Sequence, residues 1–417
     1  MKNGTKARTG LIAALDIGAS KVCCFIARAP EVGRPRVIGI GHQICHGLRG
    51  GVLIDMEAAE ASILGAVHAA EQMAGETIRG VVVNLSGGHP ASHSVGVEVP
   101  IAGHAIGESD LRRALTQSCQ SNGLAEAELI HAVPIGYSID GDRGIRDPRG
   151  MYGERLGVEM HMITAAGGAV RNFRTCIERC HLSVEEMVVS AYASGLAALV
   201  EDEIDLGVTL IDMGAGTTSF AVFYDGQVLH NDGIAVGGAH VTSDIARGLS
   251  TPIAHAERMK TLYGCAMASA EDEHDIIDVP QVGEDSCQAP NHVPRSILNG
   301  IIQPRLEETF ELVRGRLEAS GVLHLAGRRV VLTGGASQLQ GARELAALIL
   351  DKNVRMGRPL RLRGLADSVA GPAFATCAGL VAYAIDDPAA WPMPAVLPKG
   401  EPNGLIGRVG GWIREYL

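Results

Sequence analysis

The sequence predicts an α/β protein built from two matching halves, for three reasons. Two segments, Leu11–Lys21 (LIAALDIGASK) and Val208–Thr218 (VTLIDMGAGTT), each contain an apolar run that breaks at an Asp-x-Gly turn. Such a run is typical of a strand that is buried on both faces of a layered sheet. Strand and helix patterns alternate around both segments. The chain has 417 residues, of which 46% are hydrophobic, and this is enough to build two large domains.

Charge and composition exclude several classes of protein. The net charge is −11 and no long basic run is present, so we expect no nucleic-acid partner. The nine cysteines are scattered, and the start MKNGTKARTG leads directly into a core strand without the pattern of a signal peptide. We therefore expect a reducing, cytoplasmic location. No apolar stretch reaches the roughly 20 residues that span a bilayer, so we expect the chain not to cross a membrane.

The first half is predicted to contain a strand, a turn and a second strand over 11–29, then a strand over 36–43, a helix over 56–74 and a strand over 79–86. The amino-acid composition changes between Gly87 and about Thr164, where His, Gly and Pro are frequent. The alternating run HSVGVEVPI predicts a strand, and Ser109-Asp110 is a helix-cap signal. We interpret this region as a small inserted subdomain.

After the insert the chain resumes its α/β alternation, and its second half repeats the first. The predicted elements after the insert are, in order, a helix over 165–180, a strand Met187–Ser190, an Ala-rich helix, the second Asp-x-Gly turn, a hairpin at Asp225-Gly226, helices Val241–Ser250 and Ile253–Tyr263, a helix over 297–320, a strand Arg329–Leu332 and a third glycine turn, Thr333–Ser337. The acidic run EDEHDIIDVP interrupts this order as a second insert, and we expect Glu271–Asp278 to be a solvated face.

The two Asp-x-Gly turns suit the phosphates of a nucleotide. Backbone N–H groups in glycine-rich turns bind phosphate oxygens without side chains. Hydroxyls add donors, and Lys21 adds a positive charge for the terminal phosphates. Asp16 and Asp212 each end a strand, where a carboxylate commonly holds Mg²⁺ through its water shell. The predicted phosphate site comprises Asp16, Gly18, Ala19, Ser20, Lys21, Asp212, Gly214, Ala215, Gly216, Thr217 and Thr218.

These motifs resemble the actin/Hsp70/sugar-kinase superfamily. DIGASK is similar to its first phosphate motif, DMGAGTT to its second and LTGGASQL to its adenosine motif. The resemblance implies that ATP and Mg²⁺ are the ligands. It also implies that Glu257 and Lys260 reach the ribose and adenine. The adenosine motif contributes Gly334, Gly335, Ala336 and Ser337.

Within this superfamily the chain resembles the FtsA family of bacterial cell-division proteins over nearly its whole length. The resemblance lies in the run VGGAHVTSDIARGLSTPIAHAERMKTLYGCA, in the loop GIRDPRGMYGERL and in the insert after Leu85-Ser86-Gly87. It implies an actin-like fold with two RNase H-like halves. The expected subdomains are 1A (1–86, 164–195 and a return at 366–386), 1C (87–163), 2A (196–230 and 300–365) and 2B (231–299).

The C-terminal tail gives an independent indication. Five prolines between Pro388 and Pro402 predict an extended linker over 387–403. The segment 404–417 then places its large apolar residues on one side of a helix, as expected for a helix that lies in a membrane interface. The predicted lipid-facing residues are Leu405, Ile406, Val409, Trp412, Ile413 and Tyr416. A tail helix docked on the protein's own body is the alternative.

The FtsA resemblance implies a set of partners. These are the C-terminal peptide of the tubulin-like protein FtsZ at subdomain 2B, further copies of the chain in filaments, inner-membrane lipids at the tail, and later division proteins at subdomain 1C. It implies a peripheral location on the cytoplasmic face of the inner membrane at the division site.

Hydrolysis of ATP is expected to be slow at most. Relatives often place a carboxylate or amide before the second phosphate motif to orient water, whereas this chain has Val189-Ser190-Ala191-Tyr192. The catalytic residues are therefore left unassigned, and nucleotide binding is expected to act as a polymerisation switch. Two alternatives stay open: an actin-like pilus-assembly adaptor, and a small-molecule kinase of the same superfamily.

Overall fold

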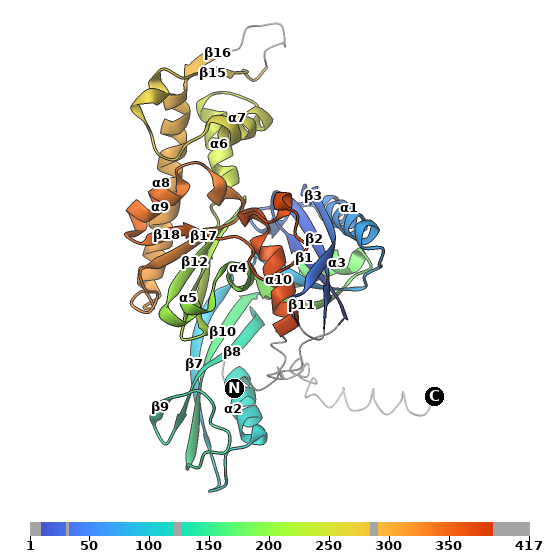
Figure 1. Ribbon diagram of the computed structural model, residues 1–417, viewed down its shortest axis with the longest axis vertical. Coiled ribbons are helices and arrows are strands. Elements are labelled where there is room, and N and C mark those ends of the chain that lie inside the picture. The colour runs from blue at the N-terminus through green and yellow to red at the C-terminus, as the bar shows by residue number, and fades with distance from the viewer. Residues whose placement is uncertain (1–9, 31–32, 121–126, 284–290, 387–417) are drawn as a thin grey trace, which may run out of the picture. The chain divides into compact units, whose positions relative to one another are not determined.

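The computed structural model describes residues 10–30, 33–120, 127–283 and 291–386 (Figure 1). The described residues form two compact units. The first contains 10–95, 127–135 and 160–386 apart from the gaps, and the second contains 96–120 and 136–159. The predicted tail over 387–417, with its linker and membrane residues, lies outside the described residues.

The first unit contains a five-stranded sheet in the order β11-β6-β1-β2-β3. Its strands are β1 (Gly10–Ile17), β2 (Lys21–Ala29), β3 (Arg36–Ile44), β6 (Gly80–Leu85) and β11 (Ser183–Val189). β1, β2 and β3 are antiparallel, whereas β6 runs parallel to both β1 and β11. Helices α1 (Met56–Ala74) and α3 (Gly167–Arg179) pack on one face, and α4 (Ser190–Ala198) and α10 (Ala375–Asp386) pack on the other.

A second five-stranded sheet in the same unit has the order β14-β13-β12-β17-β18. Its strands are β12 (Val208–Met213), β13 (Thr218–Tyr224), β14 (Gln227–Ile234), β17 (Arg329–Thr333) and β18 (Asn353–Met356). Again three strands form an antiparallel meander and two run parallel to its first strand. The prediction of two matching α/β halves is confirmed. Helix α4 joins the cores of both sheets (Figure 1).

The outer face of the second sheet packs against α6 (Gly238–Gly248), α8 (Arg295–Ala319) and α9 (Ala342–Leu350). Beyond it lie α7 (Ile253–Tyr263), the short helix η1 (Ala270–Glu273), and the hairpin of β15 (Ile276–Val279) and β16 (Asn291–Pro294). The expectation of a solvated acidic face is wrong for Asp272. Its side chain is buried, where it accepts hydrogen bonds from Ser269 N (2.9 Å) and Asn299 Nδ2 (2.8 Å).

The predicted insert forms a four-stranded sheet in the order β7-β10-β8-β9. Its elements are β7 (Ala91–Pro100), α2 (Glu108–Gln120), β8 (Ala127–Ile139), β9 (Asp142–Ile145) and β10 (Arg155–Ala166). The roots of β7, β8 and β10, which are residues 91–95, 127–135 and 160–166, belong to the first unit. There Ser92 Oγ donates to Asn231 O (2.7 Å) and accepts from Asn231 N (2.7 Å), which joins β7 to β14.

The largest differences from the predicted bounds are at the starts of β11 and α6, while other boundaries differ by one or two residues. β11 begins at Ser183 rather than at Met187 and ends at Val189; three of its first four residues are polar and exposed, so no run of apolar residues marks its start. Ser190 instead opens helix α4. Helix α6 begins at Gly238, where glycine has low helix propensity, so the sequence pattern placed the start three residues too late. Among the described residues, no helix is both long and apolar enough to span a bilayer.

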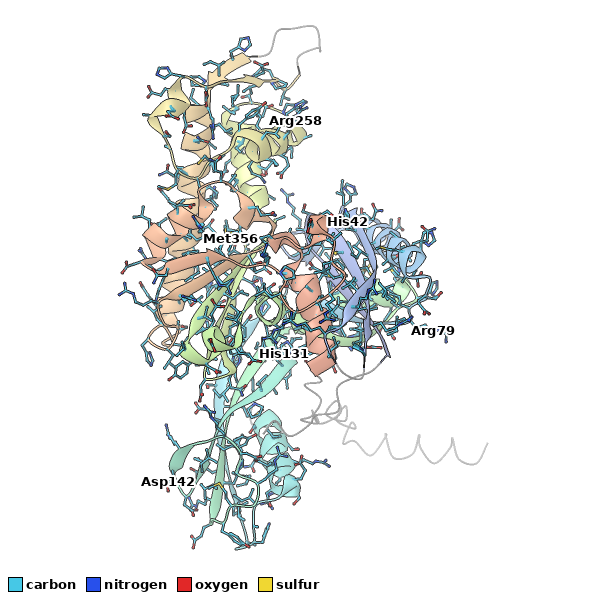
Figure 2. All side chains as sticks on the ribbon, viewed as in Figure 1. His42, Arg79, His131, Asp142, Arg258 and Met356 are labelled. Carbon is cyan, nitrogen blue, oxygen red and sulfur yellow. The ribbon has the colours of Figure 1, made fainter. Side chains whose placement is uncertain are left out.

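Two buried histidines at the roots of β8 and β10 should make the protein sensitive to acid. His131, labelled in Figure 2, accepts a hydrogen bond at Nε2 from Val189 N (3.1 Å), and its ring packs against Tyr192 and Tyr383. Burial lowers the pKa of His131 to about 3 and the pKa of His161 to about 4. Both side chains are therefore neutral in the folded protein.

Because these folded-state pKa values lie below the value of about 6.5 in an unfolded chain, the unfolded chain binds protons first as the pH falls. We expect the free energy of unfolding to drop between pH 6.5 and 4, by at most about 1.4 kcal/mol per pH unit for each histidine. Urea unfolding across this range checks the slope. His131→Gln, which keeps an acceptor for Val189, should reduce the slope to the part that His161 contributes; an unchanged slope would contradict the assignment.

Candidate functional site

The two Asp-x-Gly turns adopt the same local structure. Gly18 N donates to Lys21 O over 2.9 Å in the turn between β1 and β2, and Gly214 N donates to Thr217 O over 2.9 Å between β12 and β13. A Cβ atom at Gly18 would lie 3.2 Å from Lys21 O, and one at Gly214 would lie 3.0 Å from Thr217 O. Each turn therefore closes tightly on itself, and its glycine keeps the backbone free to approach a ligand.

The two turns also face each other. A Cβ atom at Gly216 would lie 2.9 Å from Ala19 Cβ and 2.9 Å from Gly50 N. The first turn thus touches the second at Gly216, where any larger residue would push the turns apart. Helix α6 begins beside them, because Gly238 N donates to Gly214 O (3.0 Å) and Ala239 N donates to Ala215 O (2.8 Å).

The third glycine turn reaches the same place. Gly334 has φ +88° and ψ 164°, a conformation open only to glycine, and a Cβ atom there would lie 2.4 Å from Asp212 Oδ1. Gly334 N donates to Pro372 O (3.2 Å), at the start of the short helix η4 (Pro372–Phe374). The turn is therefore fixed against the end of β12.

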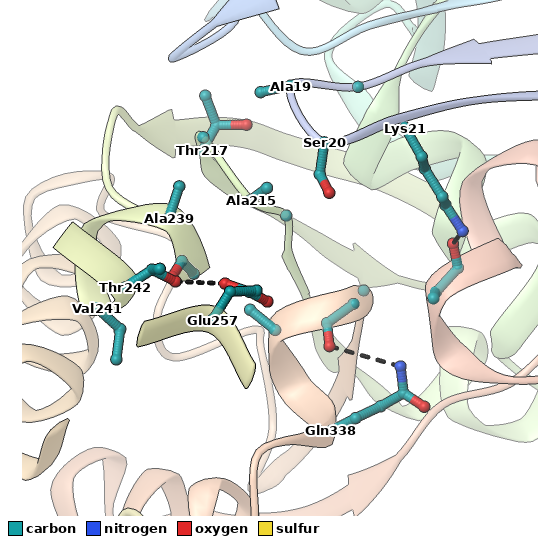
Figure 3. A pocket seen from close by; sticks show the side chains of 18 of the residues that line it. Ala19, Ser20, Lys21, Ala215, Thr217, Ala239, Val241, Thr242, Glu257 and Gln338 are labelled. Carbon is teal, nitrogen blue, oxygen red and sulfur yellow. Dashed lines mark hydrogen bonds between the residues drawn. The ribbon is translucent and has the colours of Figure 1, made fainter. Parts of the chain in front are cut away.

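These turns surround one cavity of about 830 Å³ within the first unit, a size typical of small-molecule sites (Figure 3). Of the residues predicted from the sequence, those that line it are Asp16, Gly18, Ala19, Ser20, Lys21, Asp212, Gly214, Ala215, Gly216, Thr217, Glu257, Lys260, Gly334, Gly335 and Ala336. Segments from both halves thus meet at the cavity.

Two predicted residues do not line the cavity. Thr218 is fully buried, and its hydroxyl donates to Val236 O (2.8 Å). Its neighbours Thr217 and Ser219 line the cavity instead, because side chains alternate between the faces of a strand. Ser337 is buried and donates to Gly334 O (2.7 Å), so its hydroxyl stabilises the third turn from behind.

Glu257 and Lys260 of α7 form a hydrogen-bonded group with Thr242 of α6. Glu257 Oε2 accepts from Thr242 Oγ1 (2.5 Å) and from Lys260 Nζ (2.7 Å), as Figure 3 shows for the first pair. Lys260 Nζ also donates to Gly238 O (3.1 Å). The group presents a carboxylate and an ammonium to the cavity, where they could hold the hydroxyls of a sugar.

The two aspartates at the strand ends are buried carboxylates. Burial raises the pKa of Asp16 to about 7; Lys21 opposes this shift and Asp212 adds to it. Burial also raises the pKa of Asp212, against hydrogen bonds from Ser194 and Thr376. Two buried carboxylates at one cavity are costly to ionise unless a cation offsets their charge. These oxygen donors therefore fit Mg²⁺, which prefers one or two carboxylates and keeps several waters.

No group of three His, Cys, Asp or Glu side chains within the described ranges could hold a metal directly. A cation between Asp16 and Asp212 would consequently complete its shell with water and phosphate oxygens. Lys21 lies close by in the first turn. Its Nζ donates to Ala373 O (2.5 Å) and lies 3.3 Å from the centre of the Phe374 ring.

Sequence reasoning missed three polar residues around the aspartates. Asn84 is the penultimate residue of β6, beside β1; its Oδ1 accepts from Ile17 N (2.7 Å), and the residue lines the cavity. Ser194 and Thr376 donate to Asp212 from α4 and α10. Asn84 could have been found, because a polar residue after the run VVV at the carboxyl end of a parallel strand is a site signal. Ser194 and Thr376 carry no such local signal.

Comparisons with known proteins agree with this geometry. The profile of "Cell division protein FtsA" matches residues 209–379, and that of "SHS2 domain inserted in FTSA" matches 87–164. Cell division protein FtsA of Agrobacterium fabrum is 45% identical over 421 residues, covering 98% of this chain and 95% of that protein. The Escherichia coli K12 protein of the same name is 32% identical, covering 89% and 90%.

Among solved structures, the PilM-PilN type IV pilus biogenesis complex has a similar fold, with a TM-score of 0.63. The match covers 90% of this chain and 98% of that one, at 19% identity. Identity this low shows a shared fold alone. The identity to the division proteins is higher and extends over nearly the full length of the chain. The chain has the actin-like fold and belongs to the FtsA family of cell division proteins.

Proposed function

We propose that the protein is an ATP-binding, actin-like division protein that polymerises and tethers the FtsZ ring to the cytoplasmic face of the inner membrane. The observation that carries this proposal is the pair of matched turns, which touch at Gly216 and meet at one cavity with buried carboxylates. Donors from both halves could hold one polyphosphate, whose charge neither half alone would compensate.

Different groups of the chain would bind different parts of the magnesium nucleotide. Backbone N–H groups of the first two turns, with Ser20 and Thr217, would donate to phosphate oxygens. Mg²⁺ would supply positive charge for the phosphates, held through water by Asp16 and Asp212. Glu257 and Lys260 would hold the ribose and adenine beside Gly334, Gly335 and Ala336. Ser337 and Thr218 would support the turns from behind.

Binding across the two halves would favour a closed arrangement, because a ligand shifts an equilibrium toward the state that it contacts more. Closure would favour filaments of the chain. Hydrolysis would be slow at most, since Ser190 rather than a carboxylate begins α4 beside the cavity. Nucleotide occupancy would then act as the switch.

The tail would attach such a filament to lipid. Half-burying its large apolar groups would contribute roughly 5–10 kcal/mol, while each of its three internal glycines, Gly407, Gly410 and Gly411, would cost about 1 kcal/mol in a helix. One tail would thus bind weakly. A filament would raise the effective concentration of every further tail and convert weak contacts into firm attachment.

The partners follow the family resemblance. Subdomain 2B (231–299) would bind the C-terminal peptide of FtsZ, and subdomain 1C (87–163) would contact later division proteins. The pilus-adaptor alternative rests on fold alone, since the pilus complex is 19% identical. A small-molecule kinase would need a base for a substrate hydroxyl, and the membrane tail would have no role in it.

Calorimetric titration with ATP tests the binding site. We expect the wild-type chain to bind ATP more tightly with Mg²⁺ than with a chelator. Asp212→Ala should lose at least about tenfold in affinity when Mg²⁺ is present, because a buried charge that faces the cation is removed. Asp142→Ala, on an exposed strand of the second unit, is the control. Unchanged binding of Mg²⁺ and ATP by Asp212→Ala would contradict the clamp.

A further inference from the structure

Asp212 is held by two hydroxyls from two different helices. Ser194 Oγ of α4 donates to Asp212 Oδ2 over 2.6 Å, and Thr376 Oγ1 of α10 donates to the same oxygen over 2.9 Å. All three side chains are buried; Ser194 is fully so. Hydrogen bonds to a buried carboxylate are stronger than neutral ones and costly to lose. The second phosphate turn is therefore tied to both helices.

The three oxygens also form a closed triangle, since Ser194 Oγ and Thr376 Oγ1 lie 3.0 Å apart. Two hydroxyls supply only two protons for three contacts. When both hydroxyl protons point to Asp212, no proton lies between the two hydroxyl oxygens. When Asp212 Oδ2 moves away, one hydroxyl can donate to the other instead. The triangle thus has two hydrogen-bonded arrangements: both hydroxyls donate to Asp212, or one hydroxyl donates to the other. The position of the Asp212 carboxylate selects between them.

Clamping Oδ2 also fixes the direction of Oδ1. Asp212 Oδ1 faces Gly334, where a Cβ atom would lie only 2.4 Å away, and Asp212 and Gly334 both line the cavity. One oxygen is thus held by the helices while the carboxylate stays at the cavity wall. A carboxylate oriented in advance binds a hydrated cation without first losing rotamer freedom.

The triangle lies beside a close approach of the two helices. A Cβ atom at Gly379 of α10 would lie 1.7 Å from Ala193 O of α4, so the backbones are in direct contact one turn from Thr376 and one residue from Ser194. Helix α10 packs on the first sheet, whereas α4 packs on both. Helices this close cannot slide separately, so a shift of Asp212 acts on both.

We propose that Ser194 and Thr376 are positioning residues. They orient Asp212 toward the cation of a bound magnesium nucleotide and transmit occupancy of the second phosphate turn to α4 and α10. This inference rests on the proposed function, because it assumes a magnesium nucleotide in the cavity. It goes further by naming the residues that link the site to the helices between the sheets.

The first test is the affinity for ATP, with Mg²⁺ and with a chelator, of Thr376→Val, Ser194→Ala and the wild type. Valine keeps the shape of threonine but donates no hydrogen bond. Each variant should lose about tenfold in affinity with Mg²⁺ and less than about twofold with the chelator. Thr376→Ser keeps the hydroxyl and should restore the magnesium effect. Ser118→Ala removes an equally buried hydroxyl, bonded to Ala114 O, and should change neither affinity.

The second test follows hydrogen exchange of α10 amides. Magnesium ATP should protect the first turn of α10 in the wild type and in Thr376→Ser, but not in Thr376→Val. Equal losses of affinity with and without Mg²⁺ would overturn the proposal, as would α10 protection that persists in Thr376→Val. If Thr376→Val does not fold, Ser194→Ala decides the outcome on the same readouts. A wild-type chain that binds no ATP would refute the proposed function itself, and this inference with it.

Discussion

Replacing Gly334 by alanine is expected to destabilise the protein by about 3 kcal/mol and to abolish ATP binding. The backbone at Gly334 has φ +88° and ψ 164°, which an L-residue rarely adopts. The added Cβ would lie 2.4 Å from Asp212 Oδ1 and 2.4 Å from Met213 O. The backbone strain at residue 334 and the clash of its new Cβ both act where the third turn meets the end of β12. The third turn and the end of β12 must therefore separate.

The neighbouring glycine provides the control. A Cβ atom at Gly335 would meet nothing closer than Ala373 Cβ at 3.9 Å, and its φ is not positive. Gly335→Ala should therefore unfold at nearly the wild-type temperature. Thermal unfolding of the two variants separates a requirement at Gly334 from a general sensitivity of the turn, and ATP titration of Gly334→Ala checks the loss of binding. If both variants behave alike, the close approach of Gly334 to Asp212 is not what holds the site.

Replacing Gly379 by alanine should have an effect of similar size. Its Cβ would lie 1.7 Å from Ala193 O, and a backbone oxygen within a helix cannot rotate away. Helices α4 and α10 would have to separate, which would open the packing of α10 on the first sheet. We expect a loss of about 3 kcal/mol or more, or no folded protein.

Gly315 in α8 is the matched helical control. A Cβ atom there would meet nothing within 4 Å. Alanine also has the higher helix propensity, so Gly315→Ala should stabilise the protein by about 0.5–1 kcal/mol. Urea unfolding of Gly379→Ala and Gly315→Ala should therefore give changes of opposite sign. A Gly379→Ala variant as stable as the wild type would show that the two helices are not in backbone contact.

The site could be predicted from the sequence where its signals were local. The turns after β1 and β12 follow apolar strands and carry Asp-x-Gly, so Asp16 and Asp212 could be found from a single sequence. Thr218 shows that membership of the motif does not by itself place a side chain in the cavity. Strand alternation turns its side chain into the core, while Thr217 and Ser219 line the cavity.

The rest of the site depends on tertiary structure. Ser194 lies 18 residues and Thr376 lies 164 residues from Asp212 in sequence, and both reach it because helices α4 and α10 pack against each other in the fold. Polar residues on small, Ala-rich helices look like ordinary surface or packing positions. Asp272 shows the same effect in an acidic run, because Asn299 of α8 supplies a buried partner that local sequence does not reveal.

Fold class was easier to predict than boundaries. The predicted bounds of helices α1 and α7 match the structure, and most of the predicted strands differ from it by one residue at an end. β11 was cut short, because an edge strand with exposed glutamates has no apolar pattern to mark its start. The subdomain boundaries and the residues that contact partners remain predictions.

Co-sedimentation with liposomes tests the central claim most directly. The intact chain and a chain that ends at Pro402 would each be mixed with vesicles of inner-membrane lipid composition, with and without magnesium ATP. We predict that only the intact chain pellets with the vesicles, and that more of it does so with magnesium ATP, because filaments gather many weak tails. Both chains staying in the supernatant under all conditions would contradict a nucleotide-controlled membrane tether.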